Sequence, residues 1–431
     1  MRVAPTAAIV VASITAAAAA VGQLTERPLE GALTHPAIAY ATRATSDPIA
    51  ELRGRIESGE TRLTFADDSG YLRSVLDALR VPIESQMLVM SKTGVQALHT
   101  EPGNPRAIFF NDAVTVGYIR GAPLLEFAVQ DQEQGIVLYT LDQKPQAHPT
   151  FERPSSCLRC HQAYTTLHVP GLLARSVFVA PDGLPLAQFG SYDADDRTPF
   201  RRRWGGWYVT GTHGSMVHMG NAIVADHANV DSMISDRTLN RTSLDGLFDP
   251  RGYPSAHSDI AALMVFQHQA HMANLITRVG WEARIAEYEH RLEPNAATLA
   301  GAVRELVDYA LFTEEAPLGA AIAGTSGFAE QFSAQGPRDS RGRSLRQLDL
   351  RTRLLRYPCS YMVYSAAFGH LPSAVRQAVF RRMREILSGT DTSPKYARLT
   401  GADRRAVVEI LHDTVPDFDE RSTPQRLVEA R

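Results

Sequence analysis

The sequence predicts an α+β protein with a β-rich N-terminal half and a largely helical C-terminal half. Between residues 87 and 141, short runs rich in β-branched and aromatic residues alternate with turns of Gly, Pro, Asn and Asp. After Pro254, apolar residues recur at three- and four-residue steps, as on the buried side of a helix. A chain of 431 residues has room for two or three packed domains.

The first 22 residues read as a secretory signal peptide. A positive Arg2 precedes an apolar stretch from residue 3 to residue 21, and Ala18–Ala20 supply the small residues of a cleavage site. An uncleaved membrane anchor is the alternative, but the Ala-rich core is only weakly hydrophobic. We therefore expect a periplasmic or secreted protein that has no integral membrane segment after cleavage.

Residues 46–150 are predicted to form a mixed α/β region that is mainly antiparallel sheet. Helical spacing between Ile49 and Leu79 indicates two short helices. Four or five strands should follow, with runs at residues 86–90, 106–110, 114–119 and 135–140. Further along, a turn at residues 181–183 predicts a hairpin between residues 176–179 and 186–189.

Residues 255–415 are predicted to be helical. A long amphipathic helix should run from Ser258 to His290. Asp259, Ser373 and Thr400 are candidate N-caps, because their side-chain oxygens can accept hydrogen bonds from the first free backbone N–H groups of a helix. Shorter helices should lie near residues 296–312, 344–355, 373–388 and 401–413.

Charge and cysteine content argue against two broad classes of protein. The chain has 44 Lys and Arg against 47 Asp and Glu, for a formal net charge of −3. Nucleic-acid binders usually carry a basic excess, so we expect no nucleic-acid partner. Three cysteines are too few for a disulfide scaffold.

Two of the three cysteines lie in the sequence Cys157-Leu158-Arg159-Cys160-His161, which has the C-x-x-C-H spacing of a c-type haem attachment site. Cysteines three residues apart on one helical turn can each form a thioether with a haem vinyl group, and the adjacent histidine can bind the iron. We therefore predict that Cys157 and Cys160 hold one covalent haem c and that His161 is an iron ligand. Residues 151–225 would form the haem-attachment and distal-loop region.

Three other roles fit the cysteine pair less well. A thioredoxin-like redox pair would need a strand-to-helix context, which the approach Arg153-Pro-Ser-Ser does not offer. A disulfide between Cys157 and Cys160 would leave His161 without a role. Half of a zinc site would need two more ligands at short spacing, and Cys359 is far away in the sequence.

The motif and its surroundings resemble large, exported monohaem c-type cytochromes of bacteria that are described only as cytochrome c domain-containing proteins. The resemblance rests on residues 151–161, 203–214 and 356–361. It implies one covalent haem c attached through Cys157 and Cys160, with His161 as iron ligand, and electron exchange with an unknown periplasmic redox partner. Because the chain has a single C-x-x-C-H motif, di-haem peroxidases and multihaem electron carriers are excluded.

Residues 201–221 are the predicted distal segment. Glycines there allow the backbone to approach a flat ligand, and Trp204, Trp207 and Tyr208 can stack against a macrocycle. Arg159, inside the motif, and the arginines at 201–203 can neutralise haem propionates through charge-assisted hydrogen bonds. The alternative is a glycine-rich strand-and-turn segment whose aromatic side chains belong to the core.

Three side chains are candidates for the second axial ligand of the iron. His218 and Met219 are neighbours in an extended segment, so only one of them can face the iron. We favour Met219, because a thioether suits the higher potentials of electron carriers. His268, on one face of the long predicted helix, is the rival, although a histidine on such a face is more often a hydrogen-bonded core residue.

Electron transfer through one covalent haem is therefore the predicted function. A haem enzyme of the peroxidase or oxygenase type, with an open distal site, is an alternative, because electron transfer alone does not need so long a chain. A PAS-like haem sensor is a further alternative, since the strands precede the motif. Binding of carbon monoxide by the reduced protein separates a closed six-coordinate site from both alternatives.

Overall fold

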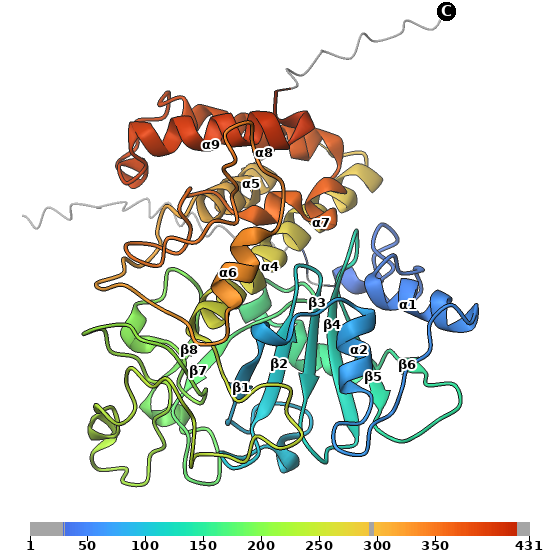
Figure 1. Ribbon diagram of the computed structural model, residues 1–431. Helices are drawn as coiled ribbons and strands as arrows, with labels where there is room; N and C mark the ends of the chain where they lie inside the picture. Colours follow the sequence, from blue (N-terminus) through green and yellow to red (C-terminus); the bar gives the residue numbers. More distant parts are fainter. Residues whose placement is uncertain (1–28, 30, 293–296, 420–431) are drawn as a thin grey trace, which may run out of the picture.

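The computed structural model describes residue 29, residues 31–292 and residues 297–419, and the predicted signal peptide at residues 1–22 lies outside these residues. The predicted α+β class is confirmed. A six-stranded antiparallel sheet occupies the N-terminal half, and most of the described helices follow it in the C-terminal half (Figure 1).

Each strand of the six-stranded sheet pairs antiparallel with the next strand along the chain. The predicted runs did not include β4, although Leu125, Phe127 and Val129 alternate there with Glu126 and Ala128 as in a half-buried strand. The strands are β1 (Met87–Val89), β2 (Arg106–Phe110), β3 (Val114–Tyr118), β4 (Leu124–Asp131), β5 (Gly135–Asp142) and β6 (Phe151–Glu152).

Helices cover both faces of this sheet: α1 (Pro48–Glu57) and α2 (Leu72–Ala78) lie on one face and α4 (Ile260–Tyr288) lies on the other (Figure 1). The two short helices expected before the sheet are thus present. Successive side chains of a strand point to opposite faces. Phe127 of β4 therefore packs with α1 and α2, and the next residue, Ala128, packs in the larger cluster around α4.

The C-terminal half is built around α4, which is buried on most sides, as its apolar sequence requires. Asp259 caps α4 and Thr400 caps α9, as predicted, whereas Pro372 rather than Ser373 occupies the N-cap position of α8. Helices α5, α8 and α9 stack beyond α4 in Figure 1. The helices after α4 are α5 (Ala297–Ala310), α6 (Phe328–Ala334), α7 (Ala366–Gly369), α8 (Ser373–Leu387) and α9 (Gly401–Thr414).

The helix predicted at residues 344–355 is wrong, because these residues form a succession of turns. The carboxylate of Asp349 accepts hydrogen bonds from the backbone N–H and the hydroxyl of Thr352 at 2.8 and 2.7 Å, and Leu350 has a φ of +52°. Local bonds from a side chain to the backbone compete with helical hydrogen bonds, and a leucine in the left-handed region cannot continue a right-handed helix.

The predicted hairpin is wrong in its second strand. Strand β7 (Arg175–Val177) pairs with β8 (Ser191–Asp193), while residues 187–189 form a short 3-10 turn. Between the two strands, Val179 and Pro185 form only an isolated bridge. Leu186 N still donates to Phe178 O at 2.8 Å, but the 3-10 turn that follows ends the pairing there.

The predicted distal segment continues the edge of the six-stranded sheet. Gly206 O accepts the backbone N–H of Met90 at 2.9 Å, and Tyr208 N donates to Leu88 O at 2.9 Å, so residues 206–208 run beside β1. Gly206 has a φ of +77°, and a Cβ there would lie 2.9 Å from the Cβ of Ser91. The glycine is therefore needed for packing against a strand.

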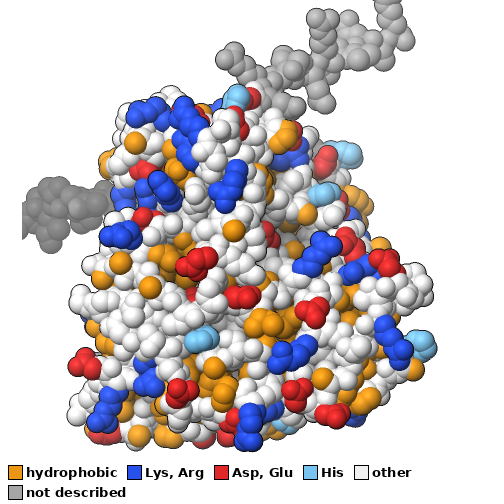
Figure 2. Space-filling model, viewed as in Figure 1, with side chains coloured by type: hydrophobic (Ala, Val, Ile, Leu, Met, Phe, Trp, Pro, Cys, Tyr) orange, Lys and Arg blue, Asp and Glu red, His pale blue; other side chains and the backbone are white. Residues whose placement is uncertain are grey.

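The visible surface mixes charges, as the near-equal numbers of 44 basic and 47 acidic residues suggest. Figure 2 shows acidic and basic side chains interspersed over this face, with hydrophobic side chains scattered among them. In the described part of the chain, no helix combines the length and the apolar character needed to cross a membrane.

Candidate functional site

The C-x-x-C-H motif forms one helical turn shortly after β6. A 3-10 turn at Ser155–Cys157 leads directly into α3 (Leu158–His161). Residues three apart lie on the same side of a helix, so the sulfurs of Cys157 and Cys160 share one side of the turn. Cys157 is half-buried, Cys160 is exposed, and both are free thiols. The turn therefore has the arrangement that two thioether bonds to one planar group require.

The imidazole of His161 is held in one orientation by the backbone at Gly171. Its Nδ1 lies 2.9 Å from Gly171 O, and Gly171 N donates in return to His161 O at 2.8 Å. A carbonyl oxygen only accepts, so Nδ1 carries the proton and Nε2 carries the lone pair. Nε2 has no hydrogen-bond partner among the described residues. Metal-binding histidines commonly donate their other ring N–H to a carbonyl in this way.

Helix α4 fixes the segment that orients His161. Asn274 accepts the backbone N–H of Leu172 at 2.9 Å and donates to Leu172 O at 2.7 Å. A Cβ on Gly171 would lie 2.2 Å from Asn274 Oδ1, so only glycine allows this approach. Thr166 adds a third restraint, because its hydroxyl donates to Val169 O at 2.8 Å. The imidazole is thus tied to the buried core through three short links.

Burial sets the protonation state of both reactive groups in the turn. It lowers the pKa of His161, which keeps the imidazole in the neutral form that can bind a metal. Burial, followed by the nearby carboxylate of Glu126, raises the pKa of the Cys157 thiol. Arg106 and Glu126 both influence His161 electrostatically. The turn therefore lies close to β2 and β4, on which these two residues stand.

The sheet beside the motif is polar and is flanked by exposed apolar side chains. Arg106 and Glu126 form an ion pair at 3.6 Å, and Gln96 donates to Glu126 Oε1 at 2.9 Å. Val95, next to Gln96, is 73% exposed and Leu98 is 97% exposed. Tyr164, three residues after His161, is 81% exposed. The exposed Tyr164 shows that apolar surface close to the motif in the sequence remains open, and a bound planar group could cover it.

The predicted distal ligands in residues 201–221 are buried and have other partners. The sulfur of Met219 accepts a hydrogen bond from Ser176 Oγ at 3.6 Å, and its side chain packs in a separate cluster with Phe178. His218 accepts the backbone N–H of Gly220 on Nδ1 at 3.0 Å, and burial lowers its pKa to about 3. Among the described residues, no hydrogen bond or ring contact joins either side chain to His161.

His268, the rival distal ligand, is fully buried inside the helical half. Its Nε2 lies 2.8 Å from Ser360 Oγ, and its Nδ1 lies 3.5 Å from the carboxylate of Asp196. The ring stacks between Tyr309 and Phe312, with centroid distances of 5.1 and 4.4 Å. One nitrogen therefore faces a side chain of the helical half and the other faces the loop that follows β8.

The three aromatic residues predicted to contact haem have different surroundings. Trp207 and Trp204 belong to the core cluster against which Cys157 also packs. Trp207 Nε1 donates to Arg175 O at 2.7 Å, whereas Trp204 Nε1 is buried without a hydrogen-bond partner in the described chain. Tyr208 lies in the cluster on the opposite face of the sheet, and its hydroxyl donates to Pro102 O at 3.0 Å.

The arginines predicted to meet haem propionates divide into two groups. Arg159, Arg201 and Arg202 are exposed. Arg203 is buried, and its guanidinium donates to the backbone oxygens of Asp196 and Thr198 at 2.7 and 2.8 Å. Arg203 therefore acts within the fold, and the exposed arginines are the ones that a surface group could reach.

The zinc alternative gains no support from the described part of the chain. No group of three or more His, Cys, Asp or Glu side chains there is arranged to hold a metal ion. Cys359, the third cysteine, is buried, and burial raises its pKa to about 12. A thiol of this kind is inert.

A group of buried acids lies next to His268 and was not predicted from the sequence. Asp196 and Glu315 are 2% and 4% exposed, and they come from segments more than 100 residues apart. Burial raises the pKa of Glu315 to about 7, and the proximity of Asp196 contributes to the shift. A buried acid with a shifted pKa marks a candidate functional position. Each acid follows another acidic residue in the sequence, Asp195 and Glu314, and nothing in this local pattern indicates that the two are buried close together.

Glu315 should make the protein less stable as the pH rises. Between the pKa of an unfolded glutamate, near 4.3, and the folded value of about 7, the folded state binds more protons than the unfolded state. The free energy of unfolding should therefore fall by about 1.4 kcal/mol per pH unit across this window. Urea unfolding of the wild type and Glu315→Gln at pH 5 and pH 7.5 measures the effect. The variant should lose this slope, and parallel slopes in both proteins would contradict the assignment.

Comparisons with known proteins identify no relative for this chain. No protein-family model, no curated protein and no solved structure matches it. The geometry around His161 is therefore the basis for the function proposed below.

Proposed function

We propose that this protein is an exported haem c protein that transfers electrons through one covalently bound haem. The orientation of His161 carries the proposal. Its Nδ1 is bound to Gly171 O at 2.9 Å, its Nε2 has no partner in the described chain, and its helical turn bears two free cysteines. A redox-active dithiol needs no histidine held in this way, and a zinc site would need more ligands than the described residues bring together, because they contain no group of three or more His, Cys, Asp or Glu arranged to hold a metal ion.

The residues of the turn have separate tasks in this proposal. Cys157 and Cys160 would provide two thioether sulfurs, and His161 Nε2 would bind the iron. Gly171 and Asn274 would prevent rotation of the imidazole, because they hold the Nδ1 side against the core. Bound haem supplies a one-electron couple between ferric and ferrous iron.

Export is part of the same proposal. The predicted signal peptide at residues 1–22 would deliver the chain to the periplasm or the medium. The redox partner would be another exported protein. Access for such a partner is supported by the exposed Cys160 and Tyr164, because they lie in and next to the proposed attachment turn and are open to the surface.

A second function, that of a haem enzyme or haem sensor, is favoured by the partners of the predicted distal ligands. Met219 is hydrogen-bonded to Ser176, and both nitrogens of His268 face other side chains. If these partners persist in the haem-loaded protein, the second axial position of the iron is open to a small molecule.

Carbon monoxide separates the two functions. For an electron carrier with two protein ligands, the visible spectrum of the reduced protein should not change when carbon monoxide is added. Met219→Ala should then open the iron to carbon monoxide if Met219 is the ligand, and His268→Ala should do so if His268 is. Met216→Ala is the matched control, since Met216 lies in the same segment and accepts the N–H of Gly319 at 3.2 Å. If the reduced wild-type protein binds carbon monoxide, the result favours the enzyme or sensor function over electron transfer.

A further inference from the structure

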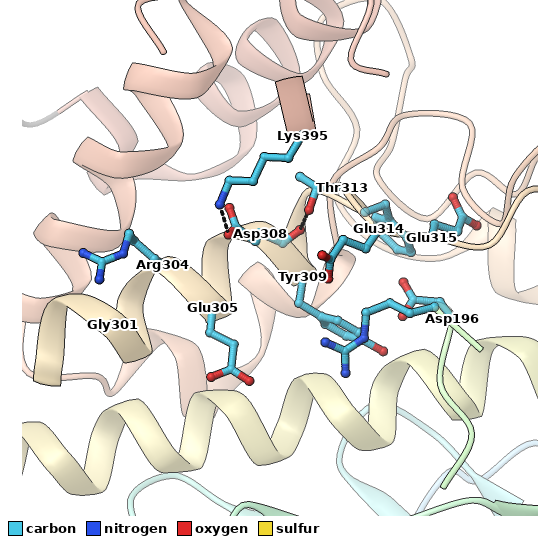
Figure 3. A pocket seen from close by; sticks show the side chains of 12 residues that line it. Asp196, Gly301, Arg304, Glu305, Asp308, Tyr309, Thr313, Glu314, Glu315 and Lys395 are labelled. Atoms are coloured by element: carbon cyan, nitrogen blue, oxygen red, sulfur yellow. Dashed lines mark hydrogen bonds and ion pairs between the residues drawn. The ribbon is translucent and has the colours of Figure 1, made fainter. Parts of the chain in front are cut away.

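A cavity of about 270 Å³ lies beside α5, lined in part by the buried acids next to His268 (Figure 3). One wall is the C-terminal part of α5, with Asp308 and Tyr309, continued by Phe312, Glu314 and Glu315 just after the helix. Asp196 and Arg197 form a second wall, and Lys395 borders the cavity from a third segment. Its walls thus combine carboxylates with aromatic rings.

Asp196 is a buried acid without a hydrogen-bond donor. Its side chain is 3% exposed, and neither carboxylate oxygen accepts a hydrogen bond among the described residues. The closest partner is His268 Nδ1 at 3.5 Å. The hydroxyl of Tyr309, whose pKa is raised by burial and by Asp196, donates to His268 O at 3.4 Å. Arg203 donates to the backbone oxygen of Asp196 rather than to the carboxylate. A buried carboxylate in this state lacks a donor that a ligand could supply.

The neighbouring charges compensate Asp196 only in part: the buried guanidinium of Arg203 acts on it electrostatically but donates its hydrogen bonds to backbone oxygens. Lys395 is paired with Asp308 at 2.5 Å, and Arg197 is paired with Asp195 at 2.6 Å. Glu315 adds a second buried acid, which accepts only the backbone N–H of Leu354 at 2.7 Å among the described residues. Above the pKa of Glu315, which burial raises to about 7, the two buried acids face the buried guanidinium of Arg203, so this end of the cavity is acidic on balance.

We propose that this cavity binds a small organic cation, with Asp196 as the counter-charge of an ammonium group and the ring of Phe312 in contact with its apolar part. Cations are attracted to aromatic faces as well as to carboxylates. A metal ion fits less well, because the described residues contain no group of three suitable ligands. The cavity is also larger than a single ion requires. This site is independent of the proposed haem.

Benzylammonium chloride is a suitable probe for the cavity, because it combines an ammonium group with an aromatic ring. Added to the purified full-length protein, it should raise the midpoint of thermal unfolding in a saturable manner. Benzyl alcohol, which is similar in shape but neutral, should have no such effect. Asp196→Asn should weaken binding of benzylammonium at least tenfold by calorimetry. Glu305→Gln, at the same cavity but paired with Arg278 at 2.8 Å, should bind as the wild type does.

Several outcomes would overturn the proposal. Equal stabilisation by benzyl alcohol would indicate an apolar cavity that does not select charge, and stabilisation by calcium or magnesium alone would indicate a metal site. If Asp196→Asn binds benzylammonium as tightly as the wild type does, Asp196 is not the counter-charge. If that variant does not fold, Glu315→Gln provides the second test. It keeps an acceptor for Leu354 N, and at pH 8 it should bind benzylammonium several-fold more weakly than the wild type.

Discussion

Replacing Cys157 and Cys160 together by alanine is expected to abolish covalent haem. Thioether bonds survive denaturation, so the wild type should retain a haem stain on a denaturing gel when it is produced in cells that attach haem c. The double variant has no sulfur in the turn to form either bond and should give no stain. Its yield of folded protein should also fall, because binding to the native state stabilises that state.

Cys359→Ala is the matched control for the double variant. Cys359 is fully buried in the helical core, and its thiol has a pKa of about 12 because of burial. This variant should stain as strongly as the wild type. A stained band from the double variant, or an unstained wild type, would contradict the assignment of the motif.

Replacing Asn274 by alanine is expected to lower the free energy of unfolding by about 2–5 kcal/mol. The amide of Asn274 satisfies both the N–H and the C=O of Leu172, at 2.9 and 2.7 Å, in a buried position. Alanine leaves both backbone groups without a partner, and each such group costs about 1–3 kcal/mol. Urea unfolding measures the loss.

The same variant tests the link between α4 and His161. In the haem-loaded protein, loss of the Asn274 restraint should shift the redox potential, since the segment that holds the imidazole becomes mobile. Gln267→Met is the matched control, because Gln267 lies on the same helix, is 2% exposed and has an Oε1 without a hydrogen-bond partner among the described residues. This control should change stability by less than about 1.5 kcal/mol. An equal loss in both variants would show that Asn274 has no special role.

Local patterns in the sequence were sufficient for much of the fold. The long helix α4 and its cap Asp259 could be predicted because apolar periodicity and capping depend on residues within a few positions of each other. Residues 344–355 show the limit of such patterns. Their apolar spacing resembles a helix, yet the local bonds of Asp349 and the positive φ of Leu350 produce turns.

The candidate site likewise has features that could be predicted from the sequence and features that depend on the tertiary structure. By itself, the sequence was enough to predict that Cys157, Cys160 and His161 share one helical turn, because their spacing matches one turn, and the structure has this turn. It could not determine which nitrogen of His161 is free, because that depends on Gly171 and, through it, on Asn274 more than 100 residues further along.

Only the tertiary structure decided the surroundings of the other candidate residues. Met219 and His268 have side chains that can bind iron, but the fold places Ser176 against the sulfur and Ser360 and Asp196 against the imidazole. The cavity beside Asp196 likewise combines residues from three separate segments of the chain. A residue type states which bonds a side chain can form, whereas its neighbours in space, brought together from distant positions by burial of the apolar core, decide which of those bonds it does form.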